Sequence, residues 1–120
     1  MATFRAMLAG DATLCSTLHW IDDATIDTGR IISIQSHRID PVQCYLANTI
    51  GLYPAGCAAI LEVVDTINAG QEPSAQAPER PGAYYSFPDQ GSLEAFAEAG
   101  HQWANPKFVT ALLSRYLPGN

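Results

Sequence analysis

Residues 13–36 have the sequence TLCSTLHWIDDATIDTGRIISIQS, and this stretch decides the fold that we expect. Its two ends, residues 13–21 and 30–36, are rich in the β-branched and aromatic residues that favour extended strands. Residues 22–29 between them are polar and end at a glycine, which is typical of a turn or loop. The stretch therefore predicts two neighbouring strands joined by an acidic loop.

A short helix is predicted immediately before the first strand. Residues 3–9, TFRAMLA, are followed by Gly10, and glycine commonly ends a helix in a left-handed conformation. Thr3 belongs to the residue types that cap helix N-termini. We therefore expect a helix over residues 3–9 that Thr3 caps and Gly10 ends.

A long helix is predicted after the second strand. Asp40 and Pro41 form an N-cap followed by proline at the first helical position, so the helix should begin at Pro41 and continue towards Gly70. Pro54 removes an i→i−4 hydrogen bond, which predicts a kink or break near it. The second half carries an apolar stripe that we expect to be core, formed by Ile60, Leu61, Val64 and Ile67.

The C-terminal part of the chain contains a connection and two more predicted helices. Residues 71–83 carry three prolines without periodicity, so an irregular surface connection is expected. Ser92 is expected to cap a helix that Gly100 closes. Asn105 and Pro106 repeat the pattern of a cap followed by proline and predict a last helix.

The composition is that of a single globular domain. The chain has 120 residues, of which 48% are hydrophobic and 15% charged, and this excludes intrinsic disorder. Its net charge of −6 argues against binding to nucleic-acid backbones. Three cysteines without a CxxC pair fit a reducing compartment. No signal-peptide pattern and no apolar run of about 20 residues are found, so we expect a cytoplasmic protein without a membrane partner.

Together these elements predict an α/β fold, one domain over residues 1–120, with few strands, a long kinked helix and C-terminal helices. A two-stranded sheet is marginal on its own, and its open edges invite pairing. The apolar stripe of the long helix also needs a surface to cover it. We therefore expect a homo-oligomer or docking on a complementing chain.

The densest polar cluster lies at the end of the first strand and in the acidic loop. His19 precedes Asp22, Asp23 and Asp27, and a carboxylate there can orient an imidazole or take a proton from an attacking amine. The alternative is that these aspartates only hydrogen-bond the loop backbone. A metal-dependent hydrolase on the same residues is a further alternative, although the histidines lack the spacing of a zinc site and no metal is expected.

A second candidate group is aromatic. Tyr84, Tyr85, Phe87 and Trp103 can stack on a sugar or pterin ring, although such residues more often cover core surface. Cys15 lies in a predicted strand without a basic neighbour, so we expect it to act as a small hydrophobe. The glycines form no phosphate-binding pattern.

Three runs of sequence carry a resemblance to a known family. They are AMLAG at 6–10, STLHWID at 16–22 and IDTGRII at 26–32. They resemble the "A-x-L-x-G" helix, the "G-x-T-L-H" strand and the "D-x-G" loop of the formyltransferases that use N10-formyltetrahydrofolate, among them the amino-sugar and methionyl-tRNA enzymes. The resemblance covers roughly residues 4–76 and extends more weakly over 84–100.

The resemblance implies roles for particular residues. Asp27 matches the family's catalytic aspartate, and His19 matches the strand histidine close to the substrate. The residues of the loop that the resemblance implies for cofactor binding are Asp22, Asp23, Thr28 and Gly29.

The implied reaction is transfer of a formyl group from N10-formyltetrahydrofolate to a small amine, such as an amino sugar or another metabolite. The acidic charge balance favours such an acceptor over tRNA. The family's Asn-x-His and H-P-S-L-L-P segments have no counterpart before Asp27, so we expect the C-terminal half of the catalytic domain, truncated on its nucleotide-fold side and incomplete alone. A non-catalytic binding or assembly module derived from that fold is the alternative.

Overall fold

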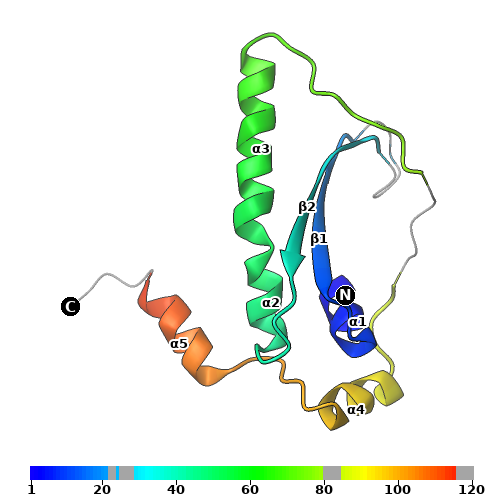
Figure 1. Cartoon of the computed structure of the whole chain (residues 1–120), viewed down its shortest axis with the longest axis vertical. Helices are drawn as coiled ribbons and strands as arrows, with labels where there is room; N and C mark the ends of the chain where they lie inside the picture. The colour runs from blue at the N-terminus through cyan, green and yellow to red at the C-terminus, as the bar shows by residue number, and fades with distance from the viewer. Residues whose placement is uncertain (22–23, 25–28, 80–84, 116–120) are drawn as a thin grey trace.

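The computed structural model describes residues 1–21, 24, 29–79 and 85–115 and places five helices and two strands in them (Figure 1). Their order along the chain is α1 (Ala2–Ala9), β1 (Thr13–His19), β2 (Ile31–Arg38), α2 (Tyr45–Gly51), α3 (Tyr53–Asn68), α4 (Gln90–Glu98) and α5 (Pro106–Ser114). This mixture of helices with a small sheet agrees with the expected α/β class.

The strands β1 and β2 form an antiparallel pair, which confirms the two neighbouring strands predicted from the sequence. The register places Thr13 opposite Arg38 at one end of the pair. At the other end, a bulge between Leu18 and His19 shifts the register. The bulge lies at the last residues of β1, and bulges commonly re-aim the side chain that follows them.

The two faces of the hairpin differ in burial, because successive side chains of a strand point to opposite faces. The covered face packs against the helices and carries Leu14, Ser16, Leu18, Ser33, Gln35 and His37. The other face includes Thr13, Thr17 and Ile34 and is exposed. Cys15 also lies on this open face, so it is not packed as the small hydrophobe that we expected.

Helix α1 occupies the predicted range and ends as predicted. Gly10 has a φ of 73° in the left-handed region and donates to carbonyl oxygens of the last turn. The predicted cap is wrong: the N-cap position is Met1, and no side chain caps the helix. Thr3 lies inside the first turn and is buried, because the helix starts one residue earlier than the sequence pattern indicates.

The start of the long helix also differs from the prediction. The Asp40 carboxylate accepts a hydrogen bond from the Val42 N–H at 3.0 Å, so it closes a turn rather than capping a helix. Pro41 lies in that turn, and α2 begins only at Tyr45, after the N-cap Cys44.

The predicted break near Pro54 is confirmed. Leu52 separates α2 from α3, and its N–H donates to the Thr49 carbonyl at 3.2 Å, a tighter i→i−3 contact. Pro54 sits in the first turn of α3, where its missing N–H costs nothing. The chain then stays helical to Asn68, and Gly70 adopts a φ of 73° just beyond the end.

For the last two helices, the predicted cap of α4 is wrong and the predicted cap of α5 is correct. Helix α4 is capped by Asp89, whose carboxylate accepts from the Ser92 N–H at 2.8 Å; Ser92 is therefore inside the helix. Hydrogen bonds from Ser92 lower the pKa of the Asp89 carboxyl. Helix α5 is capped by Asn105 as expected, through a 2.9 Å bond from the Lys107 N–H.

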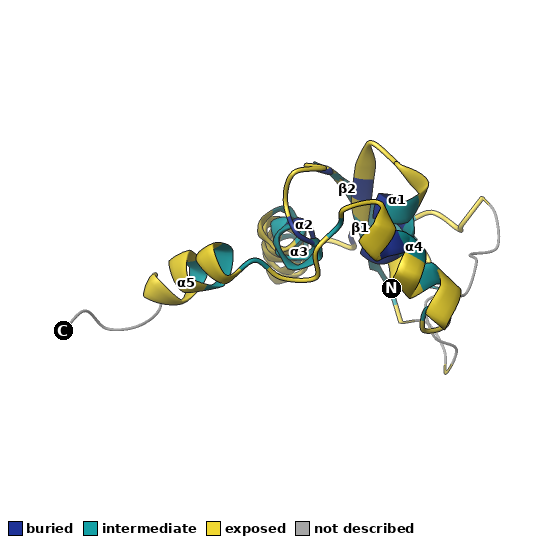
Figure 2. Ribbon diagram, turned by 90° about the horizontal axis from the view of Figure 1, so that it is seen from below, coloured by how far each residue is buried: buried dark blue, intermediate teal, exposed yellow. Residues whose placement is uncertain are grey.

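The core lies at one end of the molecule, where α1 and α4 meet (Figure 2). Phe4 and Phe96 are fully buried and their ring centroids are 4.8 Å apart. Trp103 stacks on Phe4 at 5.4 Å. The other buried members of this cluster are Ala6, Met7, Leu14 and Ile39. Helix α5 stands apart from this core and has no fully buried residue (Figure 2).

The apolar stripe predicted as core on α3 is instead exposed. Ile60, Leu61, Val64 and Ile67 keep between 43% and 65% of their surface in contact with solvent. The reason is that α3 turns a different face to the hairpin, the one that carries Gly56 and the buried Ala59. The helix therefore has two apolar faces, and the hairpin is large enough to cover one of them.

Two glycines bring the helices close to the sheet. A Cβ on Gly51 would collide with the His37 ring, at 2.6 Å from Cε1, and one on Gly56 would lie 3.3 Å from the Ser16 hydroxyl. Gly51 is the last residue of α2 and Gly56 lies within α3, so both serve close packing of the helices on the hairpin.

Replacing Gly51 with alanine is expected to lower the free energy of unfolding by about 1–3 kcal/mol, because the new methyl group must displace the His37 ring. In a His37→Ala background the same substitution should be neutral or stabilising by up to about 1 kcal/mol, because alanine favours helix more than glycine does. Urea unfolding of the wild type, both single variants and the double variant measures this coupling. Strictly additive effects would contradict the contact.

Candidate functional site

Two of the residues predicted for the formyl-transfer site lie in the part of the chain that the structure describes. His19 is half-buried at the end of β1, just after the bulge, and Gly29 is half-buried shortly before β2. The predicted site residues that lie outside the described residues are Asp22, Asp23, Asp27 and Thr28.

The structure brings His19 and Gly29 together. A Cβ on Gly29 would lie 3.5 Å from His19 Cδ2 and would collide with the backbone carbonyl of Trp20. The Trp20 N–H also donates to the Arg30 carbonyl at 2.9 Å, so the pairing of the two chain arms continues beyond the bulge. A glycine is required at position 29 because any larger residue would push these arms apart.

Gly29 is one of the residues that the resemblance implies for binding the folate cofactor. The backbone of Gly29 lies directly against that of Trp20, so this glycine closes the hairpin and does not form an open cradle. Of the residues that the resemblance implies for folate binding, Gly29 alone lies within the described residues.

The irregular segment over residues 71–79 borders the same end of the hairpin. The sequence did not indicate this contact. Gln76 pairs with Ile31, the first residue of β2, through hydrogen bonds of 2.7 and 2.8 Å in an isolated antiparallel bridge. Glu72 of the same segment lies 3.8 Å from the Arg30 guanidinium. This segment is irregular, as predicted, and it is held against β2, the strand that follows the acidic loop.

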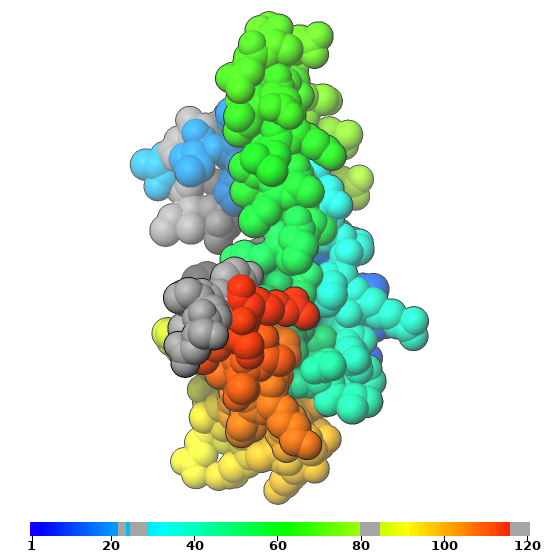
Figure 3. Space-filling view, turned by 90° about the vertical axis from the view of Figure 1, so that its left-hand side faces the viewer, coloured from blue at the N-terminus to red at the C-terminus, as the bar shows by residue number. Residues whose placement is uncertain are grey.

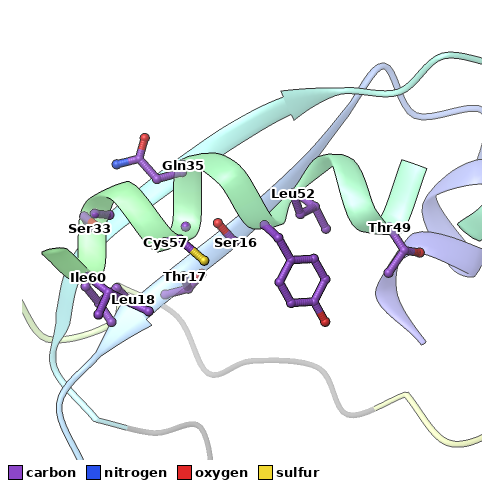
Figure 4. Close-up of a pocket in the computed structure, with 12 residues that line it drawn as sticks. Ser16, Thr17, Leu18, Ser33, Gln35, Thr49, Leu52, Cys57 and Ile60 are labelled. Atoms are coloured by element: carbon purple, nitrogen blue, oxygen red, sulfur yellow. The ribbon is translucent and has the colours of Figure 1, made fainter. Parts of the chain in front are cut away.

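A separate pocket of about 280 Å³ lies between the hairpin and the helices α2 and α3 (Figure 4). Its walls are mostly apolar and include Leu18, Leu52 and Ile60. Neither His19 nor Gly29 lines it. The pocket follows from the small residues that face the sheet, because Gly56 and Ala59 leave space that larger side chains would fill.

Three hydroxyl groups give this pocket its polar character. Ser16, Ser33 and Thr49 have buried side-chain oxygens without a hydrogen-bond partner among the residues described. Buried hydroxyls are normally hydrogen-bonded, so such a set can bind the polar atoms of a small, otherwise apolar molecule. Among the described residues, its lining contains no histidine or carboxylate, and its ionisable side chains are those of Tyr53 and Cys57.

The predicted aromatic group does not form one cluster. Trp103 packs against Phe4 and Tyr45, which agrees with the alternative that it covers core surface. Tyr85 and Phe87 are exposed, and Tyr84 lies outside the described residues. The described aromatic residues therefore give no stacking platform for a ring.

Within the described ranges, no group of three or more histidine, cysteine, aspartate or glutamate side chains could hold a metal ion. His101 packs on Phe96 at 4.8 Å, and His37 lies under α2. The three loop aspartates of the proposed hydrolase site are outside these ranges, so that alternative stays a prediction.

One helical stretch, Tyr45–Asn68, is long and apolar enough to cross a membrane by length and composition. This single stretch is weak support for a membrane segment, since core helices of other proteins pass the same test. It is longer than any apolar run that we expected from the sequence, because α2 and α3 follow one another almost without interruption.

Comparison with known proteins adds no relative: no family model and no curated protein matches the chain. The resemblance to formyltransferases therefore depends on the three short sequence motifs.

Proposed function

We propose that this chain is a formyltransferase-like protein that transfers a formyl group from N10-formyltetrahydrofolate to a small amine, together with a polypeptide that supplies the rest of the catalytic domain. The observation that supports this proposal is the order of the motifs in the fold. AMLAG ends α1 at Gly10, the STLH of the second motif forms the end of β1, and the II of the third begins β2. The hairpin also brings His19 beside Gly29.

In this proposal, the residues of the hairpin position and deprotonate the acceptor. The nitrogen of the acceptor forms a bond with the formyl carbon, the bond from that carbon to the donor nitrogen breaks, and the proton that the acceptor loses ends on the donor nitrogen. Asp27 promotes the transfer of that proton and orients an imidazole, for which His19 at the end of β1 is the candidate.

Replacing Asp27 with asparagine is expected to lower formyl transfer by about 100–10,000-fold, the usual contribution of a positioned acid–base group. The chain, reconstituted with the polypeptide that supplies the rest of the catalytic domain, is mixed with N10-formyltetrahydrofolate and amino-sugar nucleotides, and the formylated product is measured by mass spectrometry. Asp65→Asn is the matched control, because Asp65 is an exposed aspartate on α3 and its loss should leave the rate unchanged. An Asp27→Asn rate equal to that of the control would remove Asp27 from this role.

A second candidate function is a non-catalytic binding or assembly module. The exposed apolar face of α3 favours it, because such a face is typical of a surface that another molecule covers. Calorimetry with N10-formyltetrahydrofolate separates the two functions. Folate binding supports the first, whereas a stable oligomer without folate binding supports the second.

A further inference from the structure

Small residues from two sides enclose the pocket between the hairpin and the helices α2 and α3. Ser16 of β1 and Ser33 of β2 lie on the covered face of the hairpin, and Gly56 and Ala59 of α3 also line the pocket. Figure 3 shows α3 in front of the hairpin, where it covers much of it. Protein interiors leave few spaces larger than a water molecule, so about 280 Å³ between a helix and its sheet indicates room for a ligand.

The hydroxyl groups of this pocket are spread along its length. Figure 4 places Ser33 and Thr49 towards opposite ends, with Ser16 between them. The side-chain oxygens of all three are withdrawn from solvent and have no hydrogen-bond partner among the described residues. An ordered water needs about two to four polar partners, and the leucine and isoleucine side chains of the lining offer none. The arrangement therefore favours an organic molecule over water alone.

The lining indicates that the occupant is uncharged. Among the described residues it contains no charged side chain, and the chain as a whole has a net charge of −6. An ionised group would find no partner there and is far costlier to bury than a neutral hydroxyl or carbonyl group. Serine and threonine hydroxyls both donate and accept hydrogen bonds, so either of these neutral groups fits.

The volume of the pocket sets the size of the occupant. An apolar cavity of about 150 Å³ holds one benzene molecule. The pocket of about 280 Å³ therefore takes roughly twice as many atoms, which gives about 11 non-hydrogen atoms. A phenyl ring with a short alkyl alcohol has this size.

We propose that this pocket binds an uncharged, mostly apolar small molecule whose hydroxyl or carbonyl oxygen pairs with the hydroxyls of Ser16, Ser33 and Thr49. Its apolar part replaces the side chains that Gly56 and Ala59 lack. The site is separate from the residues proposed for formyl transfer that the structure describes, because neither His19 nor Gly29 lines it. Binding there stands independently of the proposed function.

Cys57 reports directly on whether the pocket is occupied. It lines the pocket and is exposed, so a bound molecule shields its thiol from a reagent in solution. Cys15 is also exposed but lies on the open face of the hairpin, which makes it a control within the same chain. Alkylation of the full chain by N-ethylmaleimide, followed at each cysteine by mass spectrometry, measures both rates at once.

The probe is 4-phenylbutan-1-ol, and its expected Kd is about 0.1–1 mM, as for a ligand of this size. At saturation it should slow alkylation of Cys57 by about 3-fold or more and leave Cys15 unchanged. Butylbenzene, which lacks the oxygen, should bind about 3–10-fold more weakly. The anion 4-phenylbutanoate should bind at least about 10-fold more weakly, because its charge has no partner.

The hydroxyls are tested in a variant that combines Ser16→Ala, Ser33→Ala and Thr49→Val. Its affinity for 4-phenylbutan-1-ol should fall by about 3–10-fold, to that of butylbenzene, whose own affinity stays unchanged. Urea unfolding should show no loss of stability in the absence of the alcohol, because the removed hydroxyls have no partners among the described residues. Thr13→Val combined with Ser36→Ala is the matched control, since both residues are exposed on the open face, and it should leave binding unchanged.

Other results would overturn the proposal. One is an alkylation rate of Cys57 that 4-phenylbutan-1-ol leaves unchanged up to about 3 mM, above the expected Kd. Equal binding of the alcohol and the anion contradicts an uncharged site. Equal binding of the alcohol by the wild type and by the triple variant, or of the alcohol and butylbenzene by the wild type, removes the hydroxyls from recognition. All of these outcomes leave the Asp27 assay untouched, so the two proposals fail separately.

Discussion

Replacing Phe96 with alanine is expected to lower the free energy of unfolding by about 3–5 kcal/mol, the range found when a buried phenylalanine is truncated. Phe96 is fully buried and lies 4.8 Å from the ring of Phe4 and 5.0 Å from that of Trp103. It is also the buried residue of α4, so its loss removes the main attachment of that helix. Because the core is small, few neighbouring side chains could move to fill the cavity that the substitution leaves.

The measurement is urea unfolding followed by tryptophan fluorescence, which reports on Trp103 beside the substituted ring. Leu93→Ala is the matched control, since Leu93 lies on the same helix and is 40% exposed, and its cost should stay below about 1 kcal/mol. If the two variants unfolded at the same urea concentration, the aromatic cluster would not be the centre of stability.

The elements that the sequence predicts well are those set by neighbouring residues. Helix α1 ends at Gly10 because a left-handed turn follows, and the break near Pro54 follows from one missing N–H. Residues 13–36 contain the strand pattern itself, so the hairpin was predictable without knowledge of its partners.

The errors come from contacts between distant residues. Asp40 and Pro41 form a good start for a helix, but the Asp40 backbone is bound by the Asn48 side chain, which delays the helix to Tyr45. The stripe on α3 was expected to be buried, yet the small residues Gly56 and Ala59 decide which face meets the sheet. Hydrophobic periodicity locates the apolar faces of a helix. Where a helix has two, it does not show which of them packs against the sheet.

The candidate site was predictable in part. The strand that carries His19 and the tight approach at Gly29 follow from the motifs around the acidic loop. The hydroxyls of Ser16 and Ser33 were not singled out, because serine in a strand carries no local signal of a pocket. Their role depends on a helix that packs across both strands.

Replacing Asn48 with aspartate is the second change for which we expect a large loss, of about 3–5 kcal/mol, because it places an unpaired charge in the interior. Asn48 is 2% exposed. Its carbonyl oxygen accepts from the Asp40 N–H at 2.9 Å, and its amide donates to the carbonyl oxygens of Asp40 at 3.0 Å and of Gln43 and Cys44 at 3.4 Å. A carboxylate keeps the first bond and turns the three contacts with carbonyl oxygens into repulsions between oxygen atoms.

The sign of the pH dependence follows from the same geometry. Burial favours the neutral form of a carboxyl group, so protonation relieves the substitution, and the deficit relative to the wild type should shrink between about pH 7 and pH 4. Urea unfolding at both pH values measures this change. Asn68→Asp, at the exposed end of α3, should cost no more than about 0.5 kcal/mol at either pH. An Asn48→Asp deficit as small as that of Asn68→Asp would mean that the buried amide does not hold the turn at Asp40 against α2.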